Sequence, residues 1–548
     1  MSFYHRQADI IIRNGTIVDG TGGLPYFADI AVRGDRIDYI GDLRGVRAKL
    51  DIDAHHRYVT PGFIDGHAHS DFTMWALPEM PNAIAQGITT EIEGNCGFTR
   101  KHFLEGIVQD AGAASVRTVY DITNGSYPAG SMAAVLDKAE ALRPAVNTAW
   151  LCGHNALRDL AGIDTVDYTP EQFRVMERFL REAMEAGFIG LSTGLEFVPG
   201  ILSRPEEVER LAAVAAEYDA NYSTHMRDEG TYILEAVNEF LNVIRKTGMR
   251  GTVSHLNVKY DNGVPNEYLQ RAMQLLKNAR EVEHLNVLCD MLPTCFATGD
   301  AFAILPPWLY QDGWEAAKRI LADEAGRARV KADCSRYWRF LAAGQWDRLL
   351  YVQPPYNASV CRTPFAELVK QSGKEPMDCF LDILAEAPTL DDATNVLMQG
   401  TVFHEQTMID SVIRDPIYMW MTDASSAPEQ GPLAARTANV QHYMSMTYFF
   451  THYIRDLGVL PIEAAVRKVT AMPAQHYRLE GRGELRVGAY ADINVFDLNA
   501  LTIHATFQEP CRFCTGMDYV LVNGVPAIAG GQHTGARTGR VLRHLPVR

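Results

Sequence analysis

Two histidines that lie one residue apart are the first candidates for chemistry in this sequence. They end the apolar stretch Pro61-Gly62-Phe63-Ile64-Asp65-Gly66-His67-Ala68-His69. Side chains two positions apart on a β-strand point to the same side, so His67 and His69 would project together from the carboxyl end of a strand. Two ligands of one metal ion need that arrangement. A pair of packed or surface histidines is the alternative interpretation.

Four more residues strengthen the metal interpretation because each follows a strand-like run. Cys96 comes after the second such run, in Gly94-Asn95-Cys96-Gly97, and Asp423 ends the late apolar run 418–422. His225 and His255 end two successive runs, one strand–helix unit apart. A single histidine there is more often packed than bound to metal, and a lone aspartate is often a helix N-cap. Histidines at equivalent positions of neighbouring units favour a shared site.

The middle of the chain alternates strands with amphipathic helices. Thr169-Pro170-Glu171-Gln172 has the form of a capping box with proline at the first helical position, and Gly187 ends the helix that follows. Strands are expected at 188–192, 221–225 and 251–255, with a helix over about 232–246 between the last two. This rhythm of about 30 residues per unit predicts a parallel sheet closed into a (β/α)₈ TIM barrel within an α/β fold. Reactive side chains of such barrels come from the carboxyl ends of the strands.

Both ends of the chain are rich in short β-strands. The first 55 or so residues read as an antiparallel module with turns at Asn14-Gly15 and Gly34-Asp35, and Asn523-Gly524 repeats the style near the other end. We therefore predict a small β-sandwich domain from 1–59 plus 480–548 around a barrel at 60–479. The irregular region 295–394 is expected to be an insertion subdomain within the barrel.

Composition excludes several classes of protein. Across 548 residues, 51 lysines and arginines against 67 aspartates and glutamates give a net charge of −16, which argues against nucleic acid and anionic membranes as partners. The N-terminal residues contain no secretory signal and no run is long enough to span a membrane. Nine scattered cysteines, without two paired C-x-x-C motifs, are typical of reduced thiols in a cytoplasmic protein. A homo-oligomer is left open.

Taken together, the motifs resemble those of the amidohydrolase superfamily, specifically the D-aminoacylase (N-acyl-D-amino-acid deacylase) family. The stretches that carry this resemblance run nearly from end to end: 61–69, 86–90 leading to 94–97, 190–195, 224–227, 254–256, 468–470, 473–474, 488–492 and 522–524. The resemblance implies a metal-bearing barrel with a β domain built from both termini. It implies that His67 and His69 hold one metal position and that Cys96, His225 and His255 complete a tighter one. Asp423 would be the catalytic aspartate.

The chemistry of these residues agrees with that assignment. A thiolate with two imidazoles suits zinc and leaves a fourth position for water. Zinc lowers the pKa of such a water to about 7 and polarises a scissile carbonyl. Asp423 would take the proton of the water and pass it to the leaving nitrogen, which an amide requires. We expect one tightly bound zinc ion, with room for a second.

Departures from the family pattern fall on substrate recognition. The family usually has a lysine for the substrate carboxylate two residues beyond the histidine matched by His255, whereas this chain has Asn257. Leu292 and Thr294 replace tyrosines, and the residues around Asp423 differ as well. Arg436 and Lys259 are candidate sources of positive charge, and His154 and Asp65 are candidates for supporting the site or the substrate. Structural hydrogen bonding is the equal alternative for these last two.

The predicted function is therefore hydrolysis of a small-molecule amide that is not a peptide bond. With an altered carboxylate clamp, a bulkier or more apolar amide or cyclic amide is expected, next to Phe72, Trp75, Trp420 and Met421. The alternatives are lactone hydrolysis or metal-assisted C–C cleavage at the same site. A protein that binds without catalysis is disfavoured because every candidate ligand and Asp423 are present.

Overall fold

The computed structural model describes most of the chain between Gln7 and His544. The described residues are 7–98, 132–258, 267–333, 339–354, 356–357, 359–394, 396–401, 406–431, 433–434 and 437–544. Lys259 and Arg436, the two candidate sources of positive charge, lie outside them.

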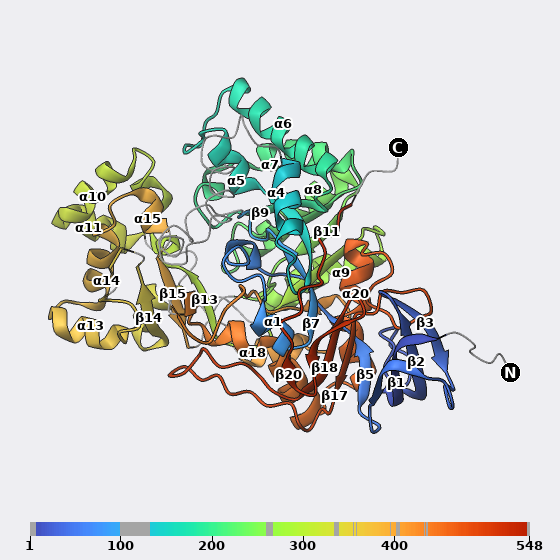
Figure 1. Ribbon diagram of the computed structural model, residues 1–548. Helices are drawn as coiled ribbons and strands as arrows, with labels where there is room; N and C mark the ends of the chain where they lie inside the picture. The colour runs from blue at the N-terminus through green and yellow to red at the C-terminus, as the bar shows by residue number, and fades with distance from the viewer. Residues whose placement is uncertain are drawn as a thin grey trace.

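The centre of the molecule is an eight-stranded parallel barrel, as predicted (Figure 1). Its first and last strands are joined beyond their ends, where Ala68 and Ala424 form a parallel bridge. The His69 amide donates to the Ala424 carbonyl at 2.8 Å, and the Asp423 amide donates to the His67 carbonyl at 3.0 Å. In chain order the strands are β6 (Phe63–Asp65), β7 (Ile88–Glu93), β8 (Asn147–Gly153), β9 (Gly190–Gly194), β10 (Asn221–His225), β11 (Arg250–Val253), β12 (Val287–Met291) and β16 (Tyr418–Trp420).

Helices cover the outside of the barrel and bury their apolar faces against it. Helix α6 begins with the predicted capping box, in which Thr169 and Gln172 bond reciprocally, and ends at Gly187 in the left-handed conformation. The barrel helices are α1 (Pro81–Ala85), α4 (Met132–Ala141), α5 (His154–Leu160), α6 (Pro170–Ala186), α7 (Pro205–Ala216), α8 (Ile233–Thr247), α9 (Glu267–Glu281), α16 (Gln406–Val412), α18 (Val440–Tyr448), the π-helix η7 (Phe449–Asp456), α19 (Ile462–Lys468) and α20 (Ala471–Tyr477).

Both termini build one β domain, as predicted, and hydrogen bonds join its nine strands into one mixed sheet. The sheet joins the N-terminal strands β1 (Ala8–Ile17), β2 (Tyr26–Arg33), β3 (Arg36–Gly41), β4 (Ala48–Asp53) and β5 (Tyr58–Pro61) to β17 (Ile493–Phe496), β18 (Met517–Val522), β19 (Val525–Ala529) and β20 (Gln532–His533). Strands β5 and β17 pair directly, which links the two ends of the chain.

The predicted turn at Asn14-Gly15 is wrong. Strand β1 continues through it, with a bulge between Ile12 and Gly15 and a φ of 53° at Asn14. Its first half pairs with β4 and its second half with β5, so both halves gain ladder hydrogen bonds by staying extended. The turns at Gly34-Asp35 and Asn523-Gly524 connect hairpins, as predicted.

The region after β12 forms a lobe with its own apolar core (Figure 1). An antiparallel sheet of β13 (Ala297–Asp300), β15 (Leu397–Gly400) and β14 (Leu349–Gln353) joins it to the barrel between the seventh and eighth barrel strands. That core also includes Cys96, Phe98 and Phe197 of the barrel. Its helices are α10 (Trp314–Ala322), α11 (Glu324–Ala332), α12 (Arg339–Ala342), α13 (Phe365–Ser372), α14 (Pro376–Ala385) and α15 (Leu390–Thr394), with short 3₁₀ turns η4 (Ala301–Ile304), η5 (Pro307–Leu309) and η6 (Trp346–Arg348).

We propose that the chain divides into a β domain of residues 1–59 and 480–548 and a barrel of residues 60–479. Residues 295–394 form an insertion within that barrel. Within the part of the chain that the structure describes, no helix is both long and apolar enough to cross a bilayer.

Candidate metal centre

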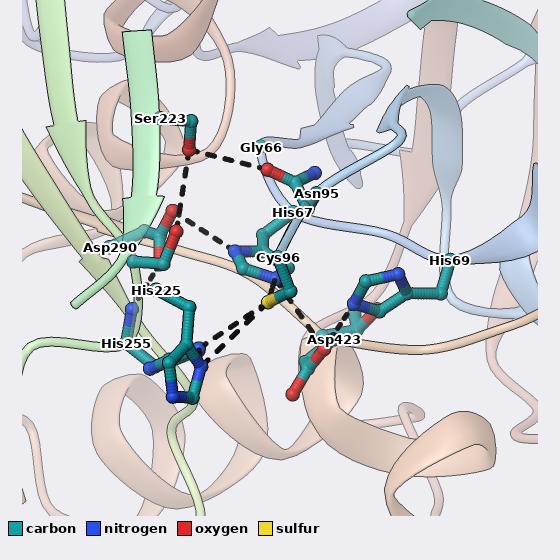
Figure 2. A network of polar contacts seen from close by, with 12 residues as sticks. Gly66, His67, His69, Asn95, Cys96, Ser223, His225, His255, Asp290 and Asp423 are labelled. Carbon is teal, nitrogen blue, oxygen red and sulfur yellow. Dashed lines mark hydrogen bonds and ion pairs between the residues drawn. The ribbon is translucent and has the colours of Figure 1, made fainter. Parts of the chain in front are cut away.

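All six residues predicted for the catalytic centre lie at the carboxyl ends of barrel strands. His67 and His69 follow β6, Cys96 follows β7 and His225 is the last residue of β10. His255 follows β11 and Asp423 follows β16. Figure 2 shows their side chains pointing toward one another across the barrel mouth. Strand positions alone were therefore sufficient to bring the six residues together.

Cys96 lies at the middle of the cluster. Its Sγ is 3.3 Å from His67 Nε2, 3.7 Å from His255 Nε2 and 4.0 Å from His225 Nδ1. The last two ring nitrogens are 3.0 Å from each other. Three imidazole nitrogens thus converge on one sulfur, inside a site where all four residues are less than 9% exposed.

Asp423 completes the other side of the cluster. Its Oδ1 lies 3.1 Å from His69 Nε2 and 3.6 Å from His67 Nε2. Two overlapping sets of ligand atoms, each within 4.8 Å of one another, follow from these positions: His67, Cys96 and His255, and His67, His69 and Asp423. Sulfur and imidazole in the first set suit zinc, and imidazole and carboxylate in the second suit zinc and several other divalent ions.

Charges in the cluster are strongly coupled. Burial would raise the pKa of Cys96, but the charge of His67 and hydrogen bonds from His225 and His255 bring it well below 9.0. Burial would lower the pKa of His255, but the charges of Glu229 and Cys96 raise it to about 10. The buried thiolate needs a compensating positive charge. Protons on the imidazoles supply that charge, and a divalent cation bound in place of those protons would supply it as well.

The Asp423 carboxylate is held in its ionised form. Burial would raise its pKa, but the hydrogen bond from His69 and the charges of His67 and His69 keep the pKa below 3.8. An ionised carboxylate beside two imidazoles can accept a proton from a nearby water, which is what a general base must do.

Three residues of the cluster have backbone conformations that L-amino acids rarely adopt. The φ angles of Cys96, His255 and Asp423 are 53°, 35° and 51°. Such conformations cost about 1–3 kcal/mol each and persist where the surroundings fix them. The Cys96 loop is fixed by Ser192, whose Oγ accepts from the Gly97 amide at 3.1 Å and donates to the Gly94 carbonyl at 2.5 Å.

Two buried aspartates tie the centre to the barrel. Asp65 accepts from the His67 amide at 3.2 Å and from both the amide and the hydroxyl of Thr422, so it joins the first and last strands. Burial raises its pKa to about 6. Asp290, at the end of β12, accepts from the His255 amide at 2.6 Å and lies 3.5 Å from His67 Nδ1. Asp65 thus holds together the two strand ends that carry His67 and Asp423, and a role for it at the site stays a prediction.

His154 belongs to a different network. Its Nε2 lies 2.7 Å from Glu207 Oε1, and Arg158 bonds both oxygens of the same carboxylate. The three side chains are completely buried. This arrangement fits the structural alternative for His154, and its substrate-binding role stays a prediction.

Two other residues predicted to recognise the substrate, Asn257 and Leu292, lie two positions after His255 and Asp290 in the sequence. Asn257 is fully buried; its Oδ1 accepts from the Val258 amide at 2.8 Å, and its Nδ2 has no hydrogen-bond partner among the described residues. Leu292 is also buried, one residue beyond β12.

Aromatic rings border two of the histidines. Phe72 stacks on His69 with ring centres 5.3 Å apart, and Phe197 lies 4.4 Å from the ring of His225. Trp75 and Trp420 pack in the barrel core instead, so the prediction that they border the substrate is wrong. Trp420, for example, stacks on Phe449 at 5.5 Å.

Sequence reasoning missed four residues beside the centre. Glu196 contacts His225, and Glu229 contacts His255. His442 of helix α18 lies near Asp423. The neighbouring Gln441 of the same helix donates to the Asp423 carbonyl at 2.9 Å. Asp290 lies two residues before Leu292, one of the positions that depart from the family pattern. Glu229 follows His225 by four residues, a spacing that could have drawn attention to it, but no comparable signal marks His442.

His442 is held in one tautomer. Its Nδ1 donates to the Thr437 carbonyl at 3.1 Å, and burial lowers its pKa to about 4, so Nε2 is a neutral acceptor. The side chain is half-buried.

Comparison with known proteins places the chain in a family. An "Amidohydrolase family" profile matches residues 51–201 and 409–528. An N-acyl-D-glutamate deacylase of Alcaligenes xylosoxydans xylosoxydans is 30% identical over 541 residues, which cover 98% of this chain and 97% of that protein. This chain belongs to the amidohydrolase family, in the group of the D-aminoacylases. A D-aminoacylase of the same organism is 29% identical over 545 residues, with 97% of each chain covered.

Solved structures of the group share the whole fold. A D-aminoacylase crystal structure has a TM-score of 0.78 at 26% identity and covers 98% of this chain and 100% of its own. An N-acyl-D-glutamate deacylase from Bordetella bronchiseptica, complexed with zinc and a phosphonate inhibitor, has a TM-score of 0.76 at 26% identity, with the same coverage. A further D-aminoacylase structure, at a TM-score of 0.76, is described in terms of its binuclear metal centre. The amidohydrolase is therefore metal-dependent and acts on C–N bonds other than peptide bonds.

Proposed function

We propose that this enzyme hydrolyses the amide bond of an N-acylated small molecule whose amine portion is uncharged or apolar. The observation that carries this proposal is the cluster around Cys96, where three imidazole nitrogens lie within 4.0 Å of the sulfur and Asp423 stands beside them. We assign His67 and His69 to one metal position and Cys96, His225 and His255 to the other, with zinc as the ion. Zinc fits these positions because their ligand atoms are sulfur and imidazole nitrogen.

The chain's own residues would divide the reaction as follows. Bound zinc would supply Lewis acidity toward water and toward the carbonyl that is attacked. Asp423, ionised and 3.1 Å from His69, would take the proton of the attacking water. It would then deliver that proton to the leaving nitrogen, because an amide anion is too basic to leave unprotonated. The products are a carboxylic acid and an amine.

The surroundings of the centre support an apolar substrate. Phe72 and Phe197 face two of the histidines, and the apolar core of the inserted lobe reaches Cys96 itself. Asn257 is uncharged, and its buried Nδ2 carries two N–H groups for which the described residues offer no acceptor. A neutral amide donor recognises a carbonyl or hydroxyl oxygen well but gives a carboxylate much less than a lysine would. We therefore expect weak recognition of substrates that carry a carboxylate, and the weakest recognition of those that carry two.

A panel of substrates tests this proposal. Zinc-loaded enzyme would be offered N-acetyl derivatives of D-leucine, D-phenylalanine, D-glutamate and D-aspartate, together with uncharged amides of apolar amines. Hydrolysis is expected to be fastest for the uncharged apolar amides, and kcat/KM is expected to be lowest for D-glutamate and D-aspartate. Efficient turnover of the acidic pair, with the apolar amides untouched, would contradict the proposed substrate class.

The alternatives from the sequence remain testable in the same experiments. Hydrolysis of an amide or a lactone incorporates one oxygen of ¹⁸O-labelled water into the acid product, whereas C–C cleavage without hydrolysis incorporates none. Amine release separates the amide from the lactone. Cytoplasmic location and a homo-oligomer stay predictions.

A further inference from the structure

Carboxylates stand behind the two histidines that share the buried side of the centre with Cys96. His225 Nε2 lies 2.9 Å from Glu196 Oε2, and His255 Nδ1 lies 2.8 Å from Glu229 Oε1. Both glutamates are buried, at 3% and 0% exposure. In each ring it is the nitrogen that points away from Cys96 that meets a carboxylate.

The chain places both glutamates in short loops at the carboxyl ends of adjacent strands. Glu196 follows β9, where the Leu195 amide donates to the His225 carbonyl at 3.0 Å. Glu229 lies in the loop between β10 and α8, which Asp228 closes by accepting from the amides of Gly230 and Tyr232 at 2.7 and 2.9 Å. The backbone around each carboxylate is therefore fixed by hydrogen bonds.

A carboxylate behind an imidazole determines which nitrogen carries the proton. The outer nitrogen of His225 hydrogen-bonds to Glu196, and the outer nitrogen of His255 forms an ion pair with Glu229. A proton held on the outer nitrogen leaves the inner nitrogen of each ring with its lone pair. His225 then presents Nδ1 and His255 presents Nε2, and these are the two atoms that lie 3.0 Å apart beside Cys96. The carboxylate also increases the basicity of the inner nitrogen, which strengthens a metal bond.

His69 provides the contrast within the same centre. Its outer nitrogen, Nδ1, is buried and has no hydrogen-bond partner among the described residues. His67 is intermediate, since its Nδ1 lies 3.5 Å from Asp290 Oδ2, beyond good hydrogen-bond geometry. The support by carboxylates is thus confined mainly to the side of the centre that holds Cys96.

We propose that Glu196 and Glu229 are positioning residues that fix the tautomers of His225 and His255 and thereby set the metal affinity of the position shared with Cys96. This proposal rests on the metal assignment of the proposed function, but it does not depend on the substrate. A direct role of Glu229 as a ligand on the outer side, together with the outer nitrogens of His225 and His255, is the competing arrangement of the same atoms.

The test is a measurement of zinc affinity in three variants, each of which replaces one glutamate by glutamine. Glu229→Gln and Glu196→Gln keep the size of the side chain and remove its charge. Glu207→Gln is the matched control, because Glu207 is a fully buried carboxylate that contacts His154 in the same way but lies in a separate network. Zinc dissociation constants would be measured by competition with a chromophoric chelator, and the absorption of the cobalt-substituted proteins would report the ligand geometry.

We expect Glu229→Gln and Glu196→Gln each to weaken zinc at the Cys96 position by about 10–100-fold, with the cobalt thiolate charge-transfer band retained. Glu207→Gln is expected to bind zinc as the unaltered enzyme does. Unchanged affinity in both glutamate variants would overturn the proposal, and so would loss of one cobalt ligand in Glu229→Gln, which would make Glu229 a ligand.

If one glutamate variant does not fold, the other tests the proposal, since each serves a different ring. The outcome is also separable from that of the proposed function. Tight zinc binding that depends on Glu229 in an enzyme without amidase activity would sustain this inference and contradict the proposed function.

Discussion

Gly194 offers a sharp test of how the centre is positioned, because it touches the backbone of Cys96. A Cβ added to Gly194 would lie 1.9 Å from the Cys96 carbonyl oxygen, whereas Cβ atoms essentially never approach heavy atoms within 3.0 Å. The two backbones would have to separate by the difference, about 1.1 Å. Zinc–ligand bonds tolerate only about 0.2 Å of displacement. Gly194→Ala is therefore expected to lose zinc at the Cys96 position.

A control on the same strand separates this effect from general strain. Gly190 is at the opposite end of β9, and an added Cβ there would meet the Asn221 carbonyl oxygen at 2.2 Å. Both alanine variants are expected to lose about 1–3 kcal/mol of stability through overpacking. Only Gly194→Ala should move Cys96, so only this variant should lose zinc and activity.

The assay is zinc content per folded chain by mass spectrometry, together with kcat/KM and thermal unfolding. We expect zinc in Gly190→Ala to match the unaltered enzyme and zinc in Gly194→Ala to fall by about one ion per chain. The reasoning would be refuted if both variants kept full zinc and equal activity while losing similar stability.

Three further predictions concern the catalytic base, the domain interface and acid stability. Asp423→Asn is expected to lower kcat by about 10²–10⁴-fold with zinc content retained, and steady-state kinetics with metal analysis check this. Asn523→Ala removes bonds to Asn147 Oδ1 at 2.8 Å and to the Thr538 carbonyl at 2.7 Å, so urea unfolding should show a loss of about 1–3 kcal/mol with kcat unchanged. If Asn523→Ala lowered kcat as much as Asp423→Asn does, the prediction that Asn523 acts only on stability would be contradicted. Burial lowers the pKa of His476 to about 3, below the 6.5 of the unfolded chain, so its stabilising contribution is lost as the pH falls from 6.5 toward 3. His476→Gln should flatten the pH dependence of the urea midpoint between pH 7 and pH 5, by up to about 1.4 kcal/mol per pH unit; an unchanged slope would disprove the assignment.

The centre could be predicted from the sequence because its residues are tied to strand ends. His225 is the last residue of a five-residue strand that periodicity identified, and Cys96 and His255 each follow a strand by a few residues. In a closed parallel barrel all such positions meet at one mouth. Once the strands are identified in the sequence, the place of these side chains at the barrel mouth therefore follows.

The supporting residues could not be predicted in the same way. Glu196 and Glu229 lie in loops with no periodic pattern, and an isolated glutamate in a sequence is usually an exposed one. Their burial depends on histidines contributed by other segments, 29 and 26 positions away. The course of β1 through Asn14-Gly15 is a similar case, because strands β4 and β5 pair on one side of it and outweigh the local turn preference.

The positions of the tryptophans could not be predicted from the sequence for a related reason. Trp75 and Trp420 are apolar and close in sequence to the catalytic residues, which favoured a place beside the substrate. Trp75 instead donates to the Asp71 carbonyl at 2.6 Å and packs against Trp150 in the barrel core. Which face of a segment meets the core depends on the packing of the closed barrel, which proximity in the sequence does not report.

Zinc titration of chelator-treated enzyme, followed by amine release from an uncharged apolar N-acyl amide, tests the central claim most directly. The account predicts no amine release without metal and recovery of hydrolysis as the position shared by Cys96, His225 and His255 fills. Full amine release by enzyme from which the metal has been removed would contradict it.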